Sequence, residues 1–140
     1  MKHLLLAAIL VSAGLLSYGQ CDKKVLLTSS KTEHLGADSS VQRTDDENTV
    51  IEFDKTTFNV APGGGQPMTG KVNSVICNWT TPFKVGRTQL KVTLSNPDGE
   101  TKNATITIEG KNGKIILLAE LEGEADKKIR LTADKFEEKK

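Results

Sequence analysis

Hydrophobic and polar residues alternate along four stretches in the second half of the chain. A period of two places every other side chain on the same face of a β-strand, so each stretch predicts a strand with one buried face. After the N-terminal segment no stretch shows the 3.6-residue period of an amphipathic helix. The four apolar series are Leu90, Val92 and Leu94; Ala104, Ile106 and Ile108; Ile115, Leu117, Ala119 and Leu121; and Ile129, Leu131 and Ala133.

Short turn sequences separate these predicted strands. Residues 96–99 read Asn-Pro-Asp-Gly, residues 111–114 contain Asn-Gly, and residues 122–127 turn the chain again. Asn-Gly is a strong signal for a two-residue hairpin, and Pro followed by Asp-Gly suits a tight turn. Because such loops are short, neighbouring strands should be antiparallel.

The last predicted hairpin also has an expected register. Placing Glu120 opposite Arg130 brings Leu121 opposite Ile129. Unlike charges then meet on one face and apolar side chains on the other, which is a favourable cross-strand arrangement.

The first half of the chain has a less regular pattern, which still predicts strands and turns. The expected elements are a strand over 25–35, a polar connection over 36–48 with room for a short edge strand around Val41, a tight hairpin over 49–53 and 56–60, a flexible turn over 61–67, a long strand over 68–79, a bend over 80–86, and a tail over 134–140 that is a solvated end or a last short turn.

Together these elements predict a single all-β domain over residues 20–140. Eight strands, or nine, follow one another in simple succession, and a meander of that length buries its edges best by closing. We therefore expect an up-and-down antiparallel barrel of about eight strands. A two-sheet β-sandwich of Greek-key type is the alternative, because strand succession alone does not separate the two.

Residues 1–19 have the three parts of a signal peptide. Lys2 gives a basic start, residues 4–16 form the apolar run, and small residues stand three and one positions before Gln20. This run is shorter than the roughly 20 residues of a transmembrane helix, and no second apolar run follows. The sequence predicts cleavage before Gln20, a secreted or periplasmic protein, and no transmembrane segment.

Cys21 and Cys77 are the only cysteines. In an oxidising compartment such a pair is most simply a disulfide, which predicts Cys21–Cys77. The alternatives are a free, buried Cys77 beside a frayed Cys21, or a lipid anchor on Cys21. Gln20 argues against the anchor because it stands where a lipoprotein signal carries a small residue.

Charge and residue inventory exclude several kinds of function. Of the 19 basic residues, Lys2 leaves with the leader, so 18 remain against 18 acidic residues. A neutral chain without a basic stripe gives no reason to expect a nucleic acid or an anionic membrane as partner. His34 is the only histidine after the leader, and the cysteines lack zinc spacing, so we expect no metal and no other cofactor.

Catalytic arrangements are equally poorly supported. A Ser/His/Asp site would need a nucleophile beside His34, and no Gly-x-Ser-x-Gly segment exists. Cys77 with His34 is a conceivable thiol–imidazole pair, but a disulfide or core cysteine explains Cys77 more simply. We therefore expect a protein that is not an enzyme.

A set of large apolar residues forms the candidate ligand cavity. Trp79 shares a predicted strand face with Cys77, which indicates core packing. The alternative places Trp79 on the wall of an internal cavity with Phe53 and Phe58. Val92, from one of the alternating strands, completes the candidate set.

On these features the chain resembles the lipocalin-like proteins that bacteria secrete. The resemblance covers residues 24–134 and rests on the strand rhythm, on TVIEFDKTTFNV at 49–60, on the Trp79 strand and on KKIRLTADKF at 127–136. Lipocalins proper carry Gly-x-Trp on their first strand, whereas the sole tryptophan here lies in mid-chain, so no ligand residue carries over. The resemblance implies a small barrel that binds a small apolar molecule.

Two functional hypotheses follow from the sequence. The first is a secreted, non-enzymatic, lipocalin-like barrel that holds a small hydrophobic ligand among its inward-facing residues. The second is a cell-surface or periplasmic interaction module for a protein or glycan, suggested by outer faces rich in threonine and asparagine.

Overall fold

The computed structural model describes residues 20–140, which form nine β-strands and one short 3-10 helix. The elements are η1 (Gln20–Asp22), β1 (Val25–Leu35), β2 (Val41–Phe53), β3 (Thr57–Pro62), β4 (Met68–Thr81), β5 (Val85–Ser95), β6 (Thr101–Lys111), β7 (Lys114–Leu121), β8 (Lys128–Thr132) and β9 (Lys135–Glu138). The predicted all-β class is confirmed.

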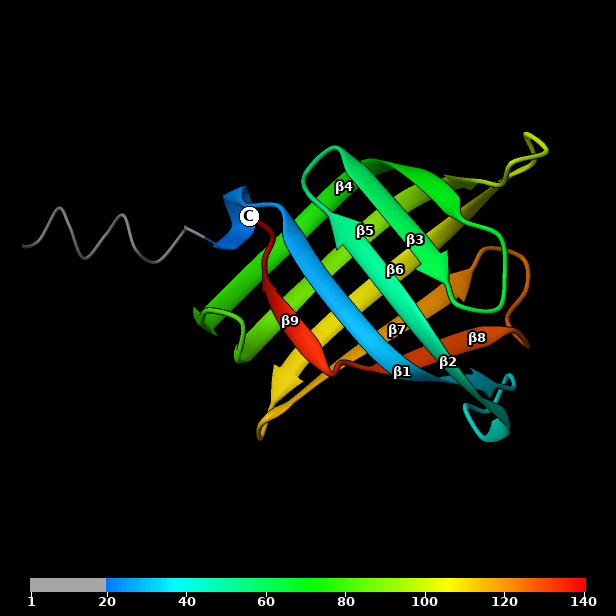
Figure 1. Ribbon diagram of the computed structural model, residues 1–140, viewed down its shortest axis with the longest axis horizontal. Helices are drawn as coiled ribbons and strands as arrows, with labels where there is room; N and C mark the ends of the chain where they lie inside the picture. Colours follow the sequence, from blue (N-terminus) through cyan, green and yellow to red (C-terminus); the bar gives the residue numbers. More distant parts are fainter. Residues whose placement is uncertain (1–19) are drawn as a thin grey trace, which may run out of the picture.

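The strands form a closed, up-and-down antiparallel barrel. Each strand from β1 to β7 pairs with the next one along the chain, and β8 pairs with the second half of β1, which closes the sheet. Figure 1 shows β1 and β2 crossing in front of β5 and β6, with the barrel interior between them. The barrel is therefore confirmed over the two-sheet sandwich.

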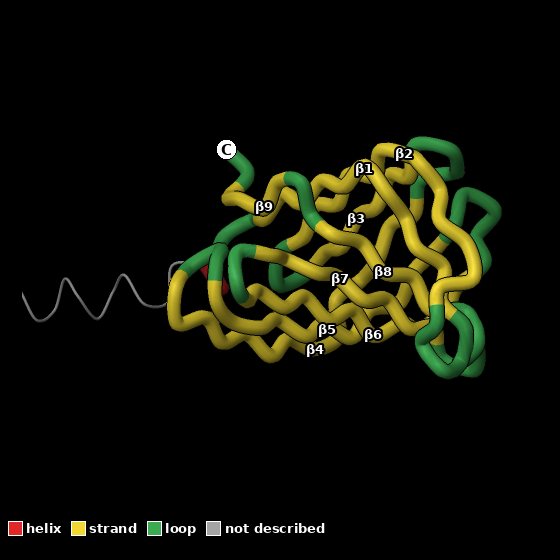
Figure 2. The backbone as a smooth tube through the Cα atoms, turned by 90° about the horizontal axis from the view of Figure 1, so that it is seen from below, coloured by secondary structure: helices red, strands yellow, loops and turns green. Residues whose placement is uncertain are grey.

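The ninth strand adds to the barrel without entering its ring. β9 pairs with Val25–Thr28 in the first half of β1, whereas β8 pairs with Thr32–Leu35 in the second half. The two short strands thus follow one another along one edge of β1, as the tube view shows (Figure 2).

The apolar side chains of the predicted alternating strands fill the barrel interior. The inward-facing residues of β5 and β6 are almost entirely buried, including Leu90, Val92, Ile106 and Ile108. They belong to a core that also takes in residues of β1, β2, β3, β4, β7 and β8. Burying these branched side chains is the main force that favours the barrel, because each contributes roughly 1.5–3 kcal/mol.

Register shifts bend the long strands β1 and β4, each of which has two. The first shift on β1 lies between Ser29 and Lys31, and the first on β4 lies between Val72 and Ser74. A bulge of this kind accentuates local twist and changes which side chains face inward. On β1 the shift makes Thr32 the next buried residue after Ser29.

The expected register of the last hairpin is wrong by two residues. Glu120 lies opposite Lys128 and Leu118 opposite Arg130. The loop is longer than expected because two successive turns, closed by hydrogen bonds from the Glu124 and Lys127 backbones, occupy it. A register shift of two residues keeps every side chain on its expected face. The predicted inward and outward faces of this hairpin are therefore still correct.

The polar connection expected over 36–48 is also wrong in part. β2 begins at Val41, and its residues up to 46 pair with β1. This end of the barrel is open to solvent, so the early part of β2 is exposed on both faces. The strand therefore lacks the alternation by which it could have been recognised.

The tail is neither a solvated end nor a simple turn. Residues 135–138 form β9, and Phe136 packs against Trp79, with ring centroids 5.5 Å apart. Only one residue of this strand reaches the core, so the sequence offered no period to detect.

A charged pair spans the seam where β8 meets β1. Arg130 lies opposite Glu33 and donates from Nε to Oε1 at 2.9 Å and from Nη2 to Oε2 at 3.1 Å. The hydrogen bond from Arg130 lowers the pKa of Glu33 below its ordinary value of 4.5, against the opposing effect of burial. A two-point contact of this type is stronger than a simple surface pair.

Replacing Glu33 with glutamine is expected to lower the free energy of unfolding by about 1 kcal/mol near neutral pH. Because the folded pKa of Glu33 lies below 4.5, the stabilisation is present above that pH and is lost as pH falls through the folded pKa. Urea unfolding of both proteins at about pH 7 and about pH 3 should show the difference shrinking in acid. Glu137→Gln, at an exposed site on β9, is the control; a difference that does not change with pH would contradict the assignment.

Candidate ligand-binding cavity

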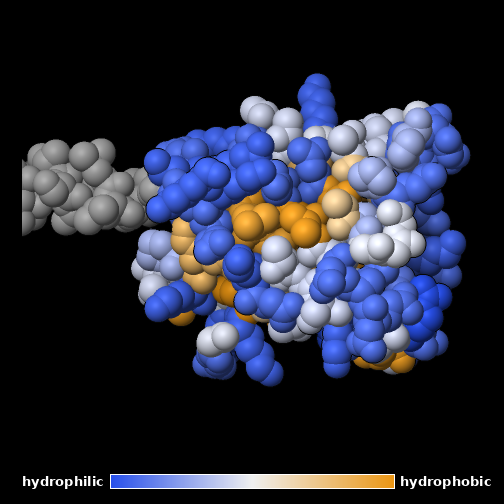
Figure 3. Space-filling view, in the orientation of Figure 1, coloured by the Kyte–Doolittle hydropathy of each residue, from blue (hydrophilic) through white to orange (hydrophobic). Residues whose placement is uncertain are grey.

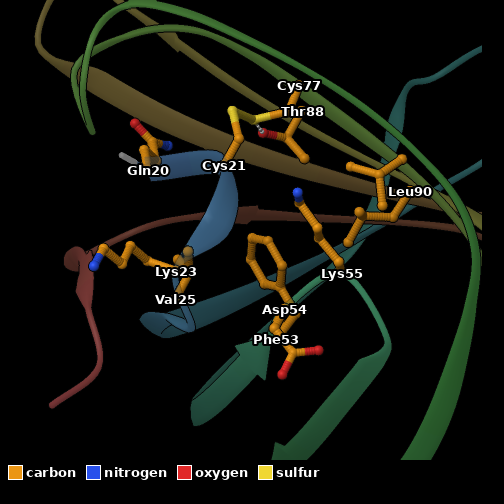
Figure 4. Close-up of a pocket in the computed structure, with 11 residues that line it drawn as sticks. Gln20, Cys21, Lys23, Val25, Phe53, Asp54, Lys55, Cys77, Thr88 and Leu90 are labelled. Atoms are coloured by element: carbon orange, nitrogen blue, oxygen red, sulfur yellow. Dashed lines mark hydrogen bonds between the residues drawn. A yellow bond between two sulfur atoms is a disulfide. The ribbon is translucent and has the colours of Figure 1, made fainter. Parts of the chain in front are cut away.

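The end of the barrel where η1 lies is closed. Cys21 on η1 forms a disulfide with Cys77 on β4, as Figure 4 shows. The buried side chain of Gln20 accepts a hydrogen bond from the Phe83 backbone N–H through Oε1, at 2.6 Å. Together these contacts hold η1 across the end of the barrel.

A small pocket remains beside the disulfide. Its volume is about 20 Å³, and its walls include Phe53, Lys55 and Leu90 (Figure 4). A single buried water needs roughly 10–15 Å³ on the same measure. This pocket therefore has room for one water and not for an organic ligand.

An aromatic cluster fills the rest of the closed end. The Phe136 ring lies between Trp79, at 5.5 Å, and Phe83, at 5.2 Å. The Trp79 indole N–H donates to Thr88 Oγ1 at 2.7 Å, and that hydroxyl donates in turn to Cys77 Sγ at 3.5 Å. The polar atoms of this end are thus paired with each other.

The opposite end of the barrel contains a cavity of about 230 Å³. All eight strands of the ring contribute to its walls, which are mainly aliphatic. The lining residues are Thr32, His34, Glu47, Thr49, Ile51, Phe58, Val60, Pro62, Met68, Leu94, Lys102, Ile106, Leu117, Ala119, Leu121, Ile129 and Leu131. The charged members of this set are partly exposed, so the cavity reaches solvent at the rim.

Two hydroxyl groups in the cavity wall have no hydrogen-bond partner among the described residues. They are Thr32 Oγ1 and Thr49 Oγ1, and each residue is only 4% exposed. The other buried polar side chains are all engaged: Gln20 and Thr88 as described above, and Ser29 by donating to the Lys31 carbonyl at 2.9 Å. Unpaired buried hydroxyls are uncommon and costly, so the cavity is where this barrel departs from ordinary packing.

Charged side chains at the rim are paired with one another. His34 Nε2 lies 2.9 Å from Asp45 Oδ2, and Arg43 Nε donates to the same oxygen at 3.3 Å. Desolvation raises the pKa of Asp45, but the hydrogen bonds and charges of Arg43 and His34 outweigh it and leave the pKa below its ordinary value.

A second ion pair lies at the rim where β6 begins. Lys102 Nζ donates to Glu124 Oε2 at 2.5 Å, and this hydrogen bond is the main reason that the pKa of Glu124 is lowered. Glu47 adds another carboxylate to the rim. The rim is therefore charged, but it carries no excess of positive charge.

The structure brings two of the four predicted cavity residues together. Phe58 lines the large cavity, and Phe53 stacks on it with ring centroids 6.1 Å apart but faces the small pocket. Trp79 belongs to the aromatic cluster of the closed end, and Val92 is buried in the core without lining the cavity. Thr32 and Thr49 were missed. Thr49 shares a strand face with Ile51, which was a usable signal, whereas the inward position of Thr32 follows from the register shift after Ser29.

The predicted Cys21–Cys77 disulfide is present. A sulfur in this bond cannot also carry a lipid, so the lipid-anchored alternative is not the state described here. The predicted signal peptide over 1–19 lies outside the described residues. Within residues 20–140, no helix is both long and apolar enough to cross a membrane, and no three His, Cys, Asp or Glu side chains gather as metal ligands.

Comparison of the chain with protein-family models, with curated proteins and with solved structures finds no match in any of the three. The site is therefore interpreted from its own geometry.

Proposed function

We propose that this protein is a non-enzymatic binding protein that holds one small, largely apolar molecule in the open end of its barrel. The observation that carries this proposal is the cavity of about 230 Å³ with its aliphatic wall. An apolar protein cavity of roughly 150 Å³ is large enough to bind benzene, whereas drug-sized ligands fill roughly 300–1,000 Å³. The ligand is therefore small, of the size of one substituted ring or a short chain.

The contrast between the two ends supports a binding role for the cavity. Eight-stranded barrels either fill their interior with side chains or hold one small ligand. Here the closed end is filled by aromatic rings, while the open end has a small residue, Ala119, and the two unpaired threonine hydroxyls. An unfilled cavity and unpaired hydroxyls both cost stability, and a bound ligand would offset both.

The disulfide supports a site of action outside the cytoplasm, because such bonds persist in oxidising compartments. It also supports the non-enzymatic assignment. Cys77, the candidate thiol partner of His34, is bonded to Cys21, and His34 is engaged with Asp45.

Toluene is expected to bind the wild-type protein and to raise its unfolding temperature, because a ligand that binds only the folded state stabilises it by mass action. Ala119→Phe places a ring inside the cavity and is expected to weaken toluene binding at least about ten-fold, since the two rings compete for the same space. Isothermal titration calorimetry and thermal unfolding with and without toluene would measure both effects.

Leu118→Phe is the matched control because residue 118 is the next residue on β7 and faces the outside of the barrel. It should leave toluene binding unchanged. Failure of toluene and of other apolar molecules of that size to bind the wild type would overturn the proposed function. Equal binding by Ala119→Phe and the wild type would show that the ligand sits elsewhere.

A second candidate function is an interaction module on the outside of the barrel, for a protein or a glycan. Figure 3 shows a short apolar strip in the middle of a mostly hydrophilic face. The exposed large hydrophobic residues come from four strands, however, and two of the most exposed are Ile76 on β4 and Val41 on β2. Binding of a surface partner that survives Ala119→Phe would favour this role over the cavity.

A further inference from the structure

We infer that the ligand of this cavity carries an uncharged hydrogen-bonding group, such as a hydroxyl or carbonyl, on its apolar body, rather than a carboxylate or ammonium group. This inference rests on the proposed function and specifies the chemistry of the same site. Its evidence is the pair of unpartnered hydroxyls on Thr32 and Thr49.

The hydroxyls define what the deep part of the cavity can recognise. A threonine hydroxyl can both donate and accept, so it can pair with alcohols, ketones, esters or amides. Both residues are 4% exposed, which places these hydroxyls well inside the charged rim. A ligand that supplies a partner removes the penalty of an unpaired buried hydroxyl, and a purely apolar ligand does not.

The two threonines lie on neighbouring strands and therefore on one side of the cavity. Thr32 is on β1, just after the register shift that turns it inward, and Thr49 is on β2 opposite Ser29. β5 and β6 lie across the barrel from these strands (Figure 1) and contribute Leu94 and Ile106 to the cavity. The ligand would direct its polar group toward β1 and β2, and its apolar body toward β5 and β6.

Charge at the rim disfavours an ionised ligand. The cations that line the cavity or adjoin it are already engaged, with Lys102 bonded to Glu124 and Arg43 bonded to Asp45. A carboxylate would gain no unengaged cation among these residues and would meet the negative charge of Glu47. An ammonium group could approach Glu47 only at the rim, and it would leave the deeper hydroxyls unpaired. Burying either ion without a partner is costly.

Four probes of similar size test the inference: toluene, benzyl alcohol, benzoate and benzylamine. Titration calorimetry near neutral pH should give an affinity for benzyl alcohol at least about ten-fold above those for benzoate and benzylamine. In the double variant Thr32→Val, Thr49→Val, benzyl alcohol should bind about ten-fold more weakly, which corresponds to the loss of one net hydrogen bond. Toluene should bind it as well as it binds the wild type, or better.

The unliganded double variant supplies a second readout. Because valine has the shape of threonine without the hydroxyl, removing two unpaired hydroxyls is expected to raise the unfolding temperature by about 3 °C or more. Thr28→Val, on the outward face of β1, is the control and should change the affinity for neither toluene nor benzyl alcohol. The two single variants identify which hydroxyl pairs with the alcohol.

The outcomes separate this inference from the proposed function. If neither toluene nor benzyl alcohol binds, the proposed function fails. If toluene binds but benzoate or benzylamine binds best, or if the double variant weakens both neutral probes equally, the cavity stands and the inference is wrong. A lower unfolding temperature for the double variant would also overturn it, because the hydroxyls would then be paired in the unliganded protein.

Discussion

Removal of the Cys21–Cys77 disulfide is expected to lower the free energy of unfolding by on the order of 4 kcal/mol. The bond joins residues 56 positions apart, so it restricts the unfolded chain over a long loop. It also anchors η1 across the closed end of the barrel. Urea unfolding of the oxidised wild type and of the double variant Cys21→Ala, Cys77→Ala would measure the difference.

The two single alanine variants serve as controls for this experiment. If the cross-link itself is responsible, each single variant loses about as much stability as the double variant, because either change breaks the bond. The cavity lies at the other end of the barrel. The folded double variant should therefore retain the toluene affinity of the wild type. A loss below about 1 kcal/mol would mean that the unfolded chain is already constrained in this region.

Replacement of Trp79 with alanine is expected to lower the free energy of unfolding by roughly 3–5 kcal/mol, which is typical of a buried aromatic residue. Trp79 is buried, with only 7% of the residue exposed to solvent. Its ring packs on Phe136, and its indole N–H is bonded to Thr88. Equilibrium unfolding of the variant, followed by circular dichroism, would measure the loss.

The glycines that pack against Trp79 explain why neighbouring side chains cannot fill the space that its ring leaves. Gly86 and Gly110 lie opposite each other, and a Cβ built on Gly110 would come within 2.7 Å of the Trp79 ring. The ring therefore covers a surface that only glycine provides. Gly110→Ala should also destabilise the protein, because Lys84 O would lie 2.5 Å from the new Cβ.

Trp79→Phe is the informative control for the alanine variant. It keeps a ring in the aromatic cluster and removes only the bonded N–H and part of the ring area, so its loss should be clearly smaller. Equal losses for the two variants would mean that the hydrogen bond to Thr88, rather than packing, makes the main contribution.

Much of the barrel could be predicted because its strands have one wet and one dry face. The alternation around Leu90 and Ile106 predicted strands and their inward faces correctly. Where the interior is itself wet, as beside Asp45 at the open end, both faces of the strand are polar and the alternation disappears. β9 was not predicted for a different reason: Phe136 is its only core residue, so the strand shows no alternation.

The candidate site was harder to predict than the fold. Alternation tells which side chains face inward, but it does not tell how far along the barrel axis each one lies. Trp79 and Phe58 both face inward, yet the first fills the closed end and the second lines the cavity. The inward turn of Thr32 depends on the register shift after Ser29, and a local irregularity of that kind leaves no mark on the hydrophobic pattern.

The position of β8 and β9 on one edge of β1 has a consequence for the order of folding. The hairpins from β2 to β7 join strands that are neighbours in the chain, so they can form early at little entropic cost. β1 can complete its second edge only when the last strands reach it, as in the Glu33–Arg130 contact between residues 97 positions apart. Until then β1 presents unpaired backbone groups, and during synthesis this edge is the part of the chain most exposed to pairing with another molecule.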